Sequence, residues 1–334
     1  HGPRVIRLTT RRWPAAPHGH DQREFCEHAR VWQLPPTAPR CDSQPMTSPL
    51  SEIAGLPRPK DDALDLFGIT HQGRVRTSNQ DHFLLCTVHP QVVVRSTSLP
   101  NIDQMTLRGE RLATVMLVAD GVGGSAHGSE ASRLATIAVT EYFASAMRCY
   151  HAAGSANEHE FTEALRDAAI DAHNRVCTQS EAQFDGRRMA TTLSVAIVVW
   201  PWLYVVQVGD SRCYTYHDGV LRQVTRDQTI AQEMVDRGAL SPERAQNSPL
   251  NHVLSSAIGA EEALPVISRV DVGKRGTVTL VCSDGLTKHV SDEEIGSAIS
   301  RMTSSEQLCH ELVDLVLERG GSDNVTVVVG RALP

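Results

Sequence analysis

The sequence is poor in aromatic residues and lacks the cysteine spacing of a zinc site. Aromatic residues make up only 4% of the 334 residues while 41% are hydrophobic, so the core must consist mainly of Val, Leu, Ile and Ala. None of the eight cysteines stands in a Cys-x-x-Cys pair, which excludes the common zinc patterns and a compact disulfide framework. Cysteines scattered over so long a chain are typical of reduced, cytosolic thiols. We interpret them as small buried hydrophobic residues.

Long apolar runs and a basic excess are also absent. The best candidate run, residues 193–206, is interrupted by Ser194 and Pro201; it falls short of the ~20 apolar residues of a membrane span and is more typical of two buried strands. Residues 1–20 contain no apolar stretch of the kind found in a signal peptide.

The formal net charge of -7 argues against nucleic acid as the main partner, because binding to a phosphate backbone needs a basic surface. We therefore expect a cytoplasmic protein that binds neither membranes nor nucleic acid.

Proline content divides the chain near residue 64. Residues 1–64 hold many of the 17 prolines, together with scattered arginines, and show no sustained apolar period. We interpret residues 1–64 as a disordered or loosely attached extension, within which Met46 is an alternative natural start. Residues 65–332 are expected to form one domain without internal repeats.

Short strand-like runs dominate this second region. Strands are expected at residues 66–70, 82–88, 91–96, 112–119, 192–199, 203–208, 213–216, 220–224, 266–272, 277–282 and 325–329. Helices are expected at residues 129–147, 160–180 and 304–319, with a shorter one after Ser291. Because strands and helices do not alternate regularly, we predict an α+β fold. It would be a four-layer α-β-β-α sandwich, in which two stacked, mainly antiparallel sheets are flanked by helices.

Several aspartates share one context, the tip of an apolar strand beside a glycine or a turn. Such a position lets a carboxylate and a backbone carbonyl face the same point. If several tips converge, they form an oxygen-only cage that suits Mg²⁺ or Mn²⁺ rather than zinc. The alternative is that each Asp-Gly pair only makes a turn, which is the role that we expect for Asp218-Gly219 in a hairpin. The four matched positions that favour a cage are Asp120, Asp210, Asp284 and Asp323.

Six short motifs carry a resemblance to a known family. Residues from about 65 to 331 resemble the bacterial type of metal-dependent serine/threonine protein phosphatase, the type 2C or PPM family, whose motifs follow in the same order. The motifs are Gly73-x-x-Arg76-x-x-Asn79-Gln80-Asp81, Val118-Ala119-Asp120-Gly121-Val122-Gly123-Gly124, Ala190-Thr191-Thr192-Leu193, Val208-Gly209-Asp210-Ser211-Arg212, Cys282-Ser283-Asp284-Gly285-Leu286 and Gly321-Ser322-Asp323-Asn324-Val325-Thr326.

The resemblance implies a metal-dependent hydrolysis of phosphoserine and phosphothreonine in proteins. A water that bridges two Mn²⁺ or Mg²⁺ ions would attack phosphorus directly. Asp120 would bridge the two ions and the carbonyl of Gly121 would complete one site. Asp284 and Asp323 would hold the other ion. Arg76 would clamp the phosphate with its guanidinium fork.

Three further residues match supporting positions of the family. Asp81 would reach the ions through water, and Asp210 would contact a third, weaker ion. Asn324 is expected to orient Asp323 or its loop. Thr191 and Thr192 are expected to support the site from the core, because a threonine nucleophile would need a neighbouring base.

The sequence departs from the family pattern at several positions. Val122 and Ser125 stand where many members carry His or another polar group, so the general acid is unassigned. His127 is a nearby candidate, although we interpret it as an exposed loop residue, and metal-bound water is the alternative acid. Gln80 stands where many members have Glu. Lys288 stands where some members place an Asp that helps to bind the third ion, which argues against a full third site.

The remaining expectations concern substrate access and partners. Residues 226–258 resemble the family's flap, which either gates the site or is a plain surface excursion. The expected partners are phosphorylated protein substrates, and the resemblance is compatible with a cognate Ser/Thr kinase; we expect a monomer. One alternative is a non-catalytic regulatory module with the same fold, which would require broken metal ligands. Another is a phosphatase of a small phosphoester, which the fold alone does not exclude.

Overall fold

A computed structural model describes residues 57–91, 93–94, 105–123, 126–145, 150, 153, 158–183 and 188–333. The chain divides into two units, residues 1–46 and 47–334, and all of the described residues belong to the second unit. The predicted extension up to residue 56, including Met46, lies outside the described residues. Within the described part, no helix has the length and apolar character needed to cross a membrane.

Two antiparallel sheets form the centre of the described unit. The first sheet contains, in spatial order, β1 (Leu64–His71), β11 (Val325–Ala332), β10 (Val278–Cys282), β7 (Arg212–His217) and β8 (Val220–Gln223). The second contains β2 (Asp81–Val88), β3 (Ala113–Val122), β5 (Leu193–Val199), β6 (Trp202–Val208) and β9 (Val266–Asp271), with β4 (Ala190–Thr191) paired to the end of β3. Val-rich central strands such as β11 are buried on both faces, as β-branched residues favour.

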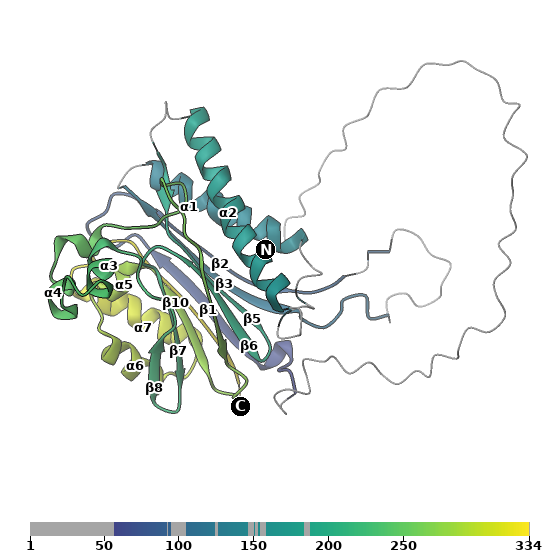
Figure 1. Ribbon diagram of the computed structural model, residues 1–334. Coiled ribbons are helices and arrows are strands. Elements are labelled where there is room, and N and C mark those ends of the chain that lie inside the picture. Colours follow the sequence, from purple (N-terminus) through teal and green to yellow (C-terminus); the bar gives the residue numbers. More distant parts are fainter. Residues whose placement is uncertain are drawn as a thin grey trace, which may run out of the picture. The chain divides into compact units, whose positions relative to one another are not determined.

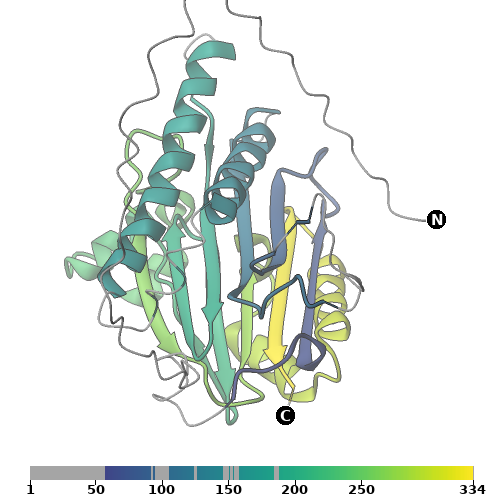
Figure 2. The same ribbon diagram turned by 90° about the vertical axis from the view of Figure 1, so that its right-hand side faces the viewer.

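Helices cover the outer face of each sheet, as Figures 1 and 2 show. The helices α1 (Ala126–Ser145) and α2 (Glu158–Gln183) pack on the second sheet, where Phe161 meets Tyr204 edge to face at 4.7 Å. On the first sheet lie α5 (Asp284–Thr287), α6 (Asp292–Arg301) and α7 (Ser305–Glu318). A third apolar cluster, which includes Met116 and Val328, fills the space between the sheets. The predicted four-layer α-β-β-α sandwich is therefore confirmed.

Local signals explain several element boundaries. Ser291 and Glu294 form a reciprocal capping box at the start of α6, which satisfies free backbone N–H groups there. The expected hairpin turn at Asp218-Gly219 is confirmed, because both residues have positive φ, 49° and 79°, and join β7 to β8. This is the geometry that the right-handed twist of a two-residue hairpin requires.

One expected strand is not formed, and one short helix was not expected. The strand expected at residues 91–96 does not form at its described positions: Gln91 makes only an isolated bridge to Arg108, and Val93 is 63% exposed. Without a sheet face to cover them, these apolar residues gain nothing from a strand conformation. Residues 92, 95 and 96 of the expected strand lie outside the described residues. The short helix α5, which begins at Asp284 shortly after β10, was not expected from the sequence.

The expected flap contains α3 (Ile230–Asp236), α4 (Pro242–Gln246) and a short 3-10 helix, η4 (Pro249–His252). Its start is fixed by Gln228, whose amide oxygen accepts a hydrogen bond from the Gly209 backbone N–H at 2.7 Å. Its return is fixed by the isolated bridge between Ile258 and Thr191. Gly209 directly precedes Asp210, and Thr191 directly precedes Thr192; both Asp210 and Thr192 were predicted to form or support the site. The flap therefore borders the end of the sandwich at which these residues lie.

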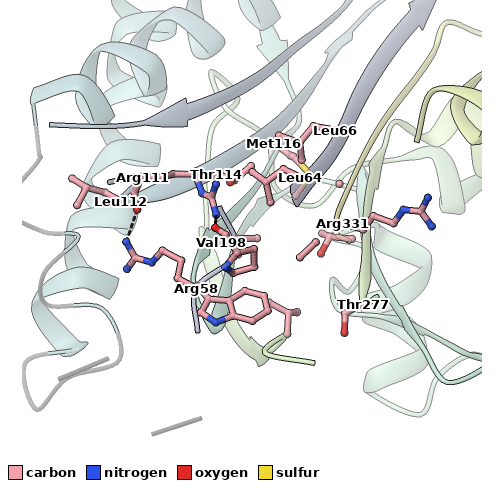
Figure 3. A pocket seen from close by; sticks show the side chains of 16 residues that line it. Arg58, Leu64, Leu66, Arg111, Leu112, Thr114, Met116, Val198, Thr277 and Arg331 are labelled. Carbon is pink, nitrogen blue, oxygen red and sulfur yellow. Dashed lines mark hydrogen bonds between the residues drawn. The ribbon is translucent and has the colours of Figure 1, made fainter. Parts of the chain in front are cut away.

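A cavity of about 40 Å³ lies at the opposite end of the sandwich, lined by Leu64, Thr114, Met116 and Ala332 among others (Figure 3). Arg111 closes one side of it by donating to the Asp61 carboxylate at 2.5 Å and to the Pro59 carbonyl at 2.8 Å. This volume holds only a few water molecules. The cavity touches the ends of β1, β3 and β11 that are farthest from the strand-tip aspartates, so it is not the candidate site.

The close approach of α5 to β11 gives a first testable prediction. A Cβ on Gly285 would lie 1.8 Å from the Asn324 carbonyl oxygen, whereas a Cβ on Gly296 of α6 would meet nothing closer than Leu221 Cβ at 3.6 Å. We expect Gly285→Ala to lower the free energy of unfolding by about 1–3 kcal/mol through overpacking. Gly296→Ala, the matched control, should raise it by about 0.5–1 kcal/mol because alanine is the better helix former. Urea denaturation measures both, and equal effects at the two positions would contradict the packing.

Candidate metal centre

The predicted strand tips converge at one end of the sandwich. Asp120 near the end of β3 lies opposite Asp81, the first residue of β2, and Asp284 follows β10, whose neighbour β11 begins just after Asp323. Because adjacent strands are antiparallel, the end of one lies beside the start of the next. The Ser283 hydroxyl then joins the two sheets by donating to Asp81 Oδ2 at 2.8 Å. The predicted strand-tip positions Asp120, Asp284 and Asp323 thus lie at one end of the sandwich, together with Asp81.

Of the aspartates at this end of the sandwich that have a carboxylate oxygen without a hydrogen-bond partner, Asp81 is the most deeply buried. It is 4% exposed, and its Oδ2 accepts hydrogen bonds from Ser283 and, at 2.7 Å, from the Thr326 hydroxyl. Its Oδ1 is buried and has no hydrogen-bond partner. Burial raises the pKa of Asp81 to about 6, against the two hydroxyl hydrogen bonds, which lower it. Ser283 and Thr326 lie inside the quoted motifs, but sequence reasoning assigned them no role.

The backbone of Asp120 is fixed by Thr191, the last residue of β4, and by Thr192, which follows it. Thr192 donates its N–H to the Asp120 carbonyl at 2.8 Å and accepts the Asp120 N–H on its hydroxyl at 3.0 Å. Thr191 donates its hydroxyl to the same carbonyl at 2.8 Å. The Thr192 hydroxyl also contacts that of Ser211 at 2.7 Å. The expected supporting role of both threonines is therefore confirmed in its geometry.

Burial and mutual repulsion disfavour negative charge at this end of the sandwich. Burial, followed by the charges of Asp81 and Asp284, raises the pKa of Asp120 well above its ordinary value. Burial, followed by the charge of Asp284, raises the pKa of Asp210 to about 8. Carboxylates that lie near one another and are buried away from water need a neighbouring cation to stay ionised.

Asp323 is held by two cationic side chains. Arg76 Nε lies 2.7 Å from Asp323 Oδ1, and another guanidinium nitrogen donates to Oδ2 at 2.8 Å. Lys288 Nζ lies 2.7 Å from Asp323 Oδ2 and 2.6 Å from Asp284 Oδ2. Burial opposes ionisation of Asp323, but the hydrogen bonds from Arg76 and Lys288 outweigh it and hold the pKa below its ordinary value. The Arg76 side chain is 42% exposed, so it also faces solvent.

Asn324 organises the loop that carries Arg76. Its side-chain amide donates to the Gln72 and Ser78 carbonyls at 2.8 and 2.9 Å and accepts the Gln80 N–H at 2.9 Å. Its own N–H donates to Asp323 Oδ1 at 2.9 Å. Asn324 therefore orients both Asp323 and residues 72–80, as expected from the sequence.

Gly121 and His127 lie where β3 meets the first turn of α1. A Cβ on Gly121 would lie 2.3 Å from the Gly128 carbonyl oxygen, so only glycine fits. That the Gly121 carbonyl binds a metal ion stays a prediction. His127 was expected to be an exposed loop residue, but it belongs to α1 and is half-buried; the helix begins earlier than its apolar period indicated. Ser125 and Gly124 lie outside the described residues.

The donor set fits a hard divalent cation, although the described side chains do not form a closed site. No group of three His, Cys, Asp or Glu side chains within the described residues has the spacing of a bound metal. The buried, unpartnered Oδ1 atoms of Asp81 and Asp284 nevertheless offer oxygen ligands, which Mg²⁺ and Mn²⁺ prefer. The place between Asp284 and Asp323 is filled by the Lys288 ammonium. Asp210 is near enough for its charge to raise the pKa of Asp120.

The raised carboxyl pKa values predict how the stability of the metal-free protein depends on pH. Asp210 has a folded pKa of about 8 against an ordinary value of 3.8. The folded state therefore binds the proton more tightly, so its stabilising contribution is complete below about pH 4 and is lost as the pH rises through about 8. In EDTA, we expect the melting temperature to fall between about pH 5 and 8.5.

Asp210→Asn should flatten this slope, because a neutral amide removes the titration, while Asp218→Asn in the exposed hairpin should not. Thermal melts across the pH range measure all three proteins. A melting temperature that rises with pH, or equal slopes for Asp210→Asn and the unsubstituted protein, would contradict the prediction.

The family model described as protein phosphatase 2C matches residues 94–317, more than half of the chain. The serine/threonine protein phosphatase PstP of Mycobacterium tuberculosis is 36% identical over 218 residues, which are 65% of this chain and 40% of that relative. The chain thus spans well under half the length of this relative. The serine/threonine phosphatase stp of Listeria monocytogenes is 29% identical over 215 residues, 64% of this chain and 83% of that protein.

A solved structure agrees with these sequence relatives. The catalytic domain of the serine/threonine protein phosphatase PstP, in complex with two manganese ions, has a TM-score of 0.63 and 30% identity to this chain. The match covers 81% of this chain and 99% of that structure. The four-layer fold, the order of the strand-tip aspartates and the family match lead to one assignment: the chain belongs to the protein phosphatase 2C family.

Proposed function

We propose that this chain is a metal-dependent phosphatase that removes phosphate from phosphoserine and phosphothreonine in proteins. The observation that carries the proposal is the convergence of buried carboxylates, with the unpartnered Oδ1 atoms of Asp81 and Asp284, beside the solvent-facing guanidinium of Arg76. Such a site offers negative ligands for cations and a positive group for phosphate within one cluster. The names of the PstP and stp relatives support the substrate class.

The proposed roles follow the position of each residue. Asp120, the carbonyl of Gly121, Asp284 and Asp323 would hold two divalent ions, with Mn²⁺ favoured by the PstP complex and Mg²⁺ as the alternative. Those ions would supply Lewis acidity to activate water and to neutralise charge on the phosphate. Asp81, Asp210 and Asn324 would support this site, either as weaker metal ligands or by positioning the ligands.

The residues of the chain itself prepare this chemistry. Thr191 and Thr192 fix the Asp120 backbone, and so the point of the strand from which its carboxylate projects. Asn324 holds the Arg76 loop at three points. Arg76 can exchange one of its hydrogen bonds to Asp323 for a phosphate oxygen, because it is partly exposed. Preorganised donors of this kind stabilise the charge that develops on phosphoryl oxygens.

The site itself does not separate protein from small-molecule phosphoesters, so the test uses both. We propose phosphorylated proteins as substrates, a cognate Ser/Thr kinase as the opposing enzyme, and a cytoplasmic location for the reaction.

The first functional prediction concerns the metal and Asp120. We expect hydrolysis of a phosphothreonine peptide with Mn²⁺, none with EDTA, and a loss of at least about 100-fold in kcat for Asp120→Asn, because this change removes a charged ligand. Asp218→Asn is a matched control: it alters another Asp-Gly pair, in the β7–β8 turn, and should retain full activity. Phosphate release is measured on the peptide and on p-nitrophenyl phosphate. Absence of hydrolysis with both Mn²⁺ and Mg²⁺ would refute the proposed function, and a strong preference for the small ester would refute the substrate class.

The second prediction concerns phosphate binding. Losing a hydrogen bond to a charged group costs about 1.5–3 kcal/mol, so Arg76→Ala should reduce kcat/KM by roughly 10- to 150-fold. Arg74→Ala is the matched control, since Arg74 is an exposed neighbour whose backbone N–H bonds to Gly321. Steady-state kinetics on the same peptide distinguish the two positions. Similar losses for both variants would show that general positive charge, rather than the Arg76 fork, binds the phosphate.

A further inference from the structure

Lys288 takes a position that a metal ion in this site would need. The side chain reaches back over one helical turn, since its backbone N–H bonds to the Asp284 carbonyl at 2.9 Å. Its Nζ then lies 2.6 Å from Asp284 Oδ2 and 2.7 Å from Asp323 Oδ2. Asp284 begins α5 shortly after β10, and Asp323 lies in the loop before β11, so one ammonium joins two chain segments that are distant in sequence.

The ammonium and a divalent ion would require the same oxygen atoms. A Mn²⁺ or Mg²⁺ ion binds carboxylate oxygens at roughly 2.0–2.2 Å, whereas the ammonium uses the same two Oδ2 atoms at hydrogen-bond distance. An ion between Asp284 and Asp323 would also lie next to a fixed positive charge. The two cations therefore exclude each other at this position.

We propose that Lys288 is a tethered cation that competes with a divalent ion for Asp284 and Asp323, so that metal binding there requires its ammonium to move away. This inference rests on the proposed function, because it assumes that a metal binds between these carboxylates. The Lys288 side chain is 26% exposed, which leaves it a route toward solvent. Its stem has four rotatable carbons, so the ammonium can move without any change in the backbone.

The competition has two consequences of opposite sign. In the metal-free protein the ammonium offsets repulsion between Asp284 and Asp323, since it lies within 2.7 Å of an oxygen of each. Removing it should therefore destabilise the metal-free protein. The same change frees the two Oδ2 atoms and removes a repelling charge, so it should strengthen metal binding. A lysine with a purely structural role would produce only the first effect.

The test measures Mn²⁺ binding to the full chain after EDTA removal, by isothermal titration calorimetry and by the electron paramagnetic resonance signal of free Mn²⁺. Lys288→Met keeps the side-chain length but loses the charge, and we expect its weakest Mn²⁺ site to bind at least about tenfold more tightly. Lys274→Met is the matched control, since Lys274 is exposed in the turn before β10, at the far end of that strand. It should bind Mn²⁺ as the unsubstituted chain does.

A second measurement needs no variant. Lys60, Lys274 and Lys288 are the lysines of the sequence, so peptide mass spectrometry can follow amine labelling at each one. Saturating Mn²⁺ should increase labelling of Lys288 several-fold while Lys274 stays constant, because the displaced ammonium leaves its ion pairs.

The outcomes separate the inference from the proposed function. Equal Mn²⁺ affinities of the Lys288→Met and unsubstituted chains, or labelling of Lys288 that is unchanged by Mn²⁺, overturn the inference alone when Mn²⁺ binds and the peptide is hydrolysed. If neither chain binds Mn²⁺, the proposed function and the inference both fail.

Discussion

The organisation of this site depends on how the chain compensates carboxylates that it has removed from water. Asp81, Asp120 and Asp210 lie together where burial and like charge both oppose ionisation. The Ser283 and Thr326 hydroxyls donate hydrogen bonds to Asp81. The Arg76 and Lys288 cations pair with Asp323, and Lys288 also pairs with Asp284. A surface cluster of acids would need none of these groups, because water would solvate it. The buried carboxylates are thus stabilised by groups of the protein itself, and they are the oxygen donors that the proposed divalent ions would use.

The sandwich provides the rigidity that such a cluster requires. Each aspartate sits at the tip of a buried strand or beside one, and the ladders β2–β3 and β10–β11 fix their relative heights. Close backbone contacts that leave no room for a Cβ atom also hold the strand tips in place: Gly121 lies against Gly128, and Gly285 lies against Asn324. Repelling carboxylates would otherwise move apart, so close backbone packing is what holds them near one another.

Much of this arrangement could be predicted from the sequence, for a physical reason. Apolar runs that end in Asp-Gly define both a buried strand and its tip, so the strands that end near Asp120 and Asp284 followed from local pattern. Asp81 was matched only through the family resemblance. The Lys288 bridge could not be predicted, because it depends on the distance between α5 and the loop before β11. The short helix α5 was itself missed: four residues have too little periodicity to be recognised. His127 was misplaced in the same way, since the first turn of α1 carries no apolar repeat.

The Lys288 ammonium, which is tethered to the chain, affects how stable the site is without metal. A cluster without internal cations would repel itself until metal arrived, and its folding would depend on metal. Here Lys288 and Arg76 already neutralise Asp323 and part of Asp284, so the fold has less need of metal for its stability. The same neutralisation must be undone when an ion binds between those carboxylates, and this lowers the net gain from binding. Under the proposed metal binding, a stable metal-free site and tight metal binding oppose each other, and the position of the Lys288 side chain would set the balance between them.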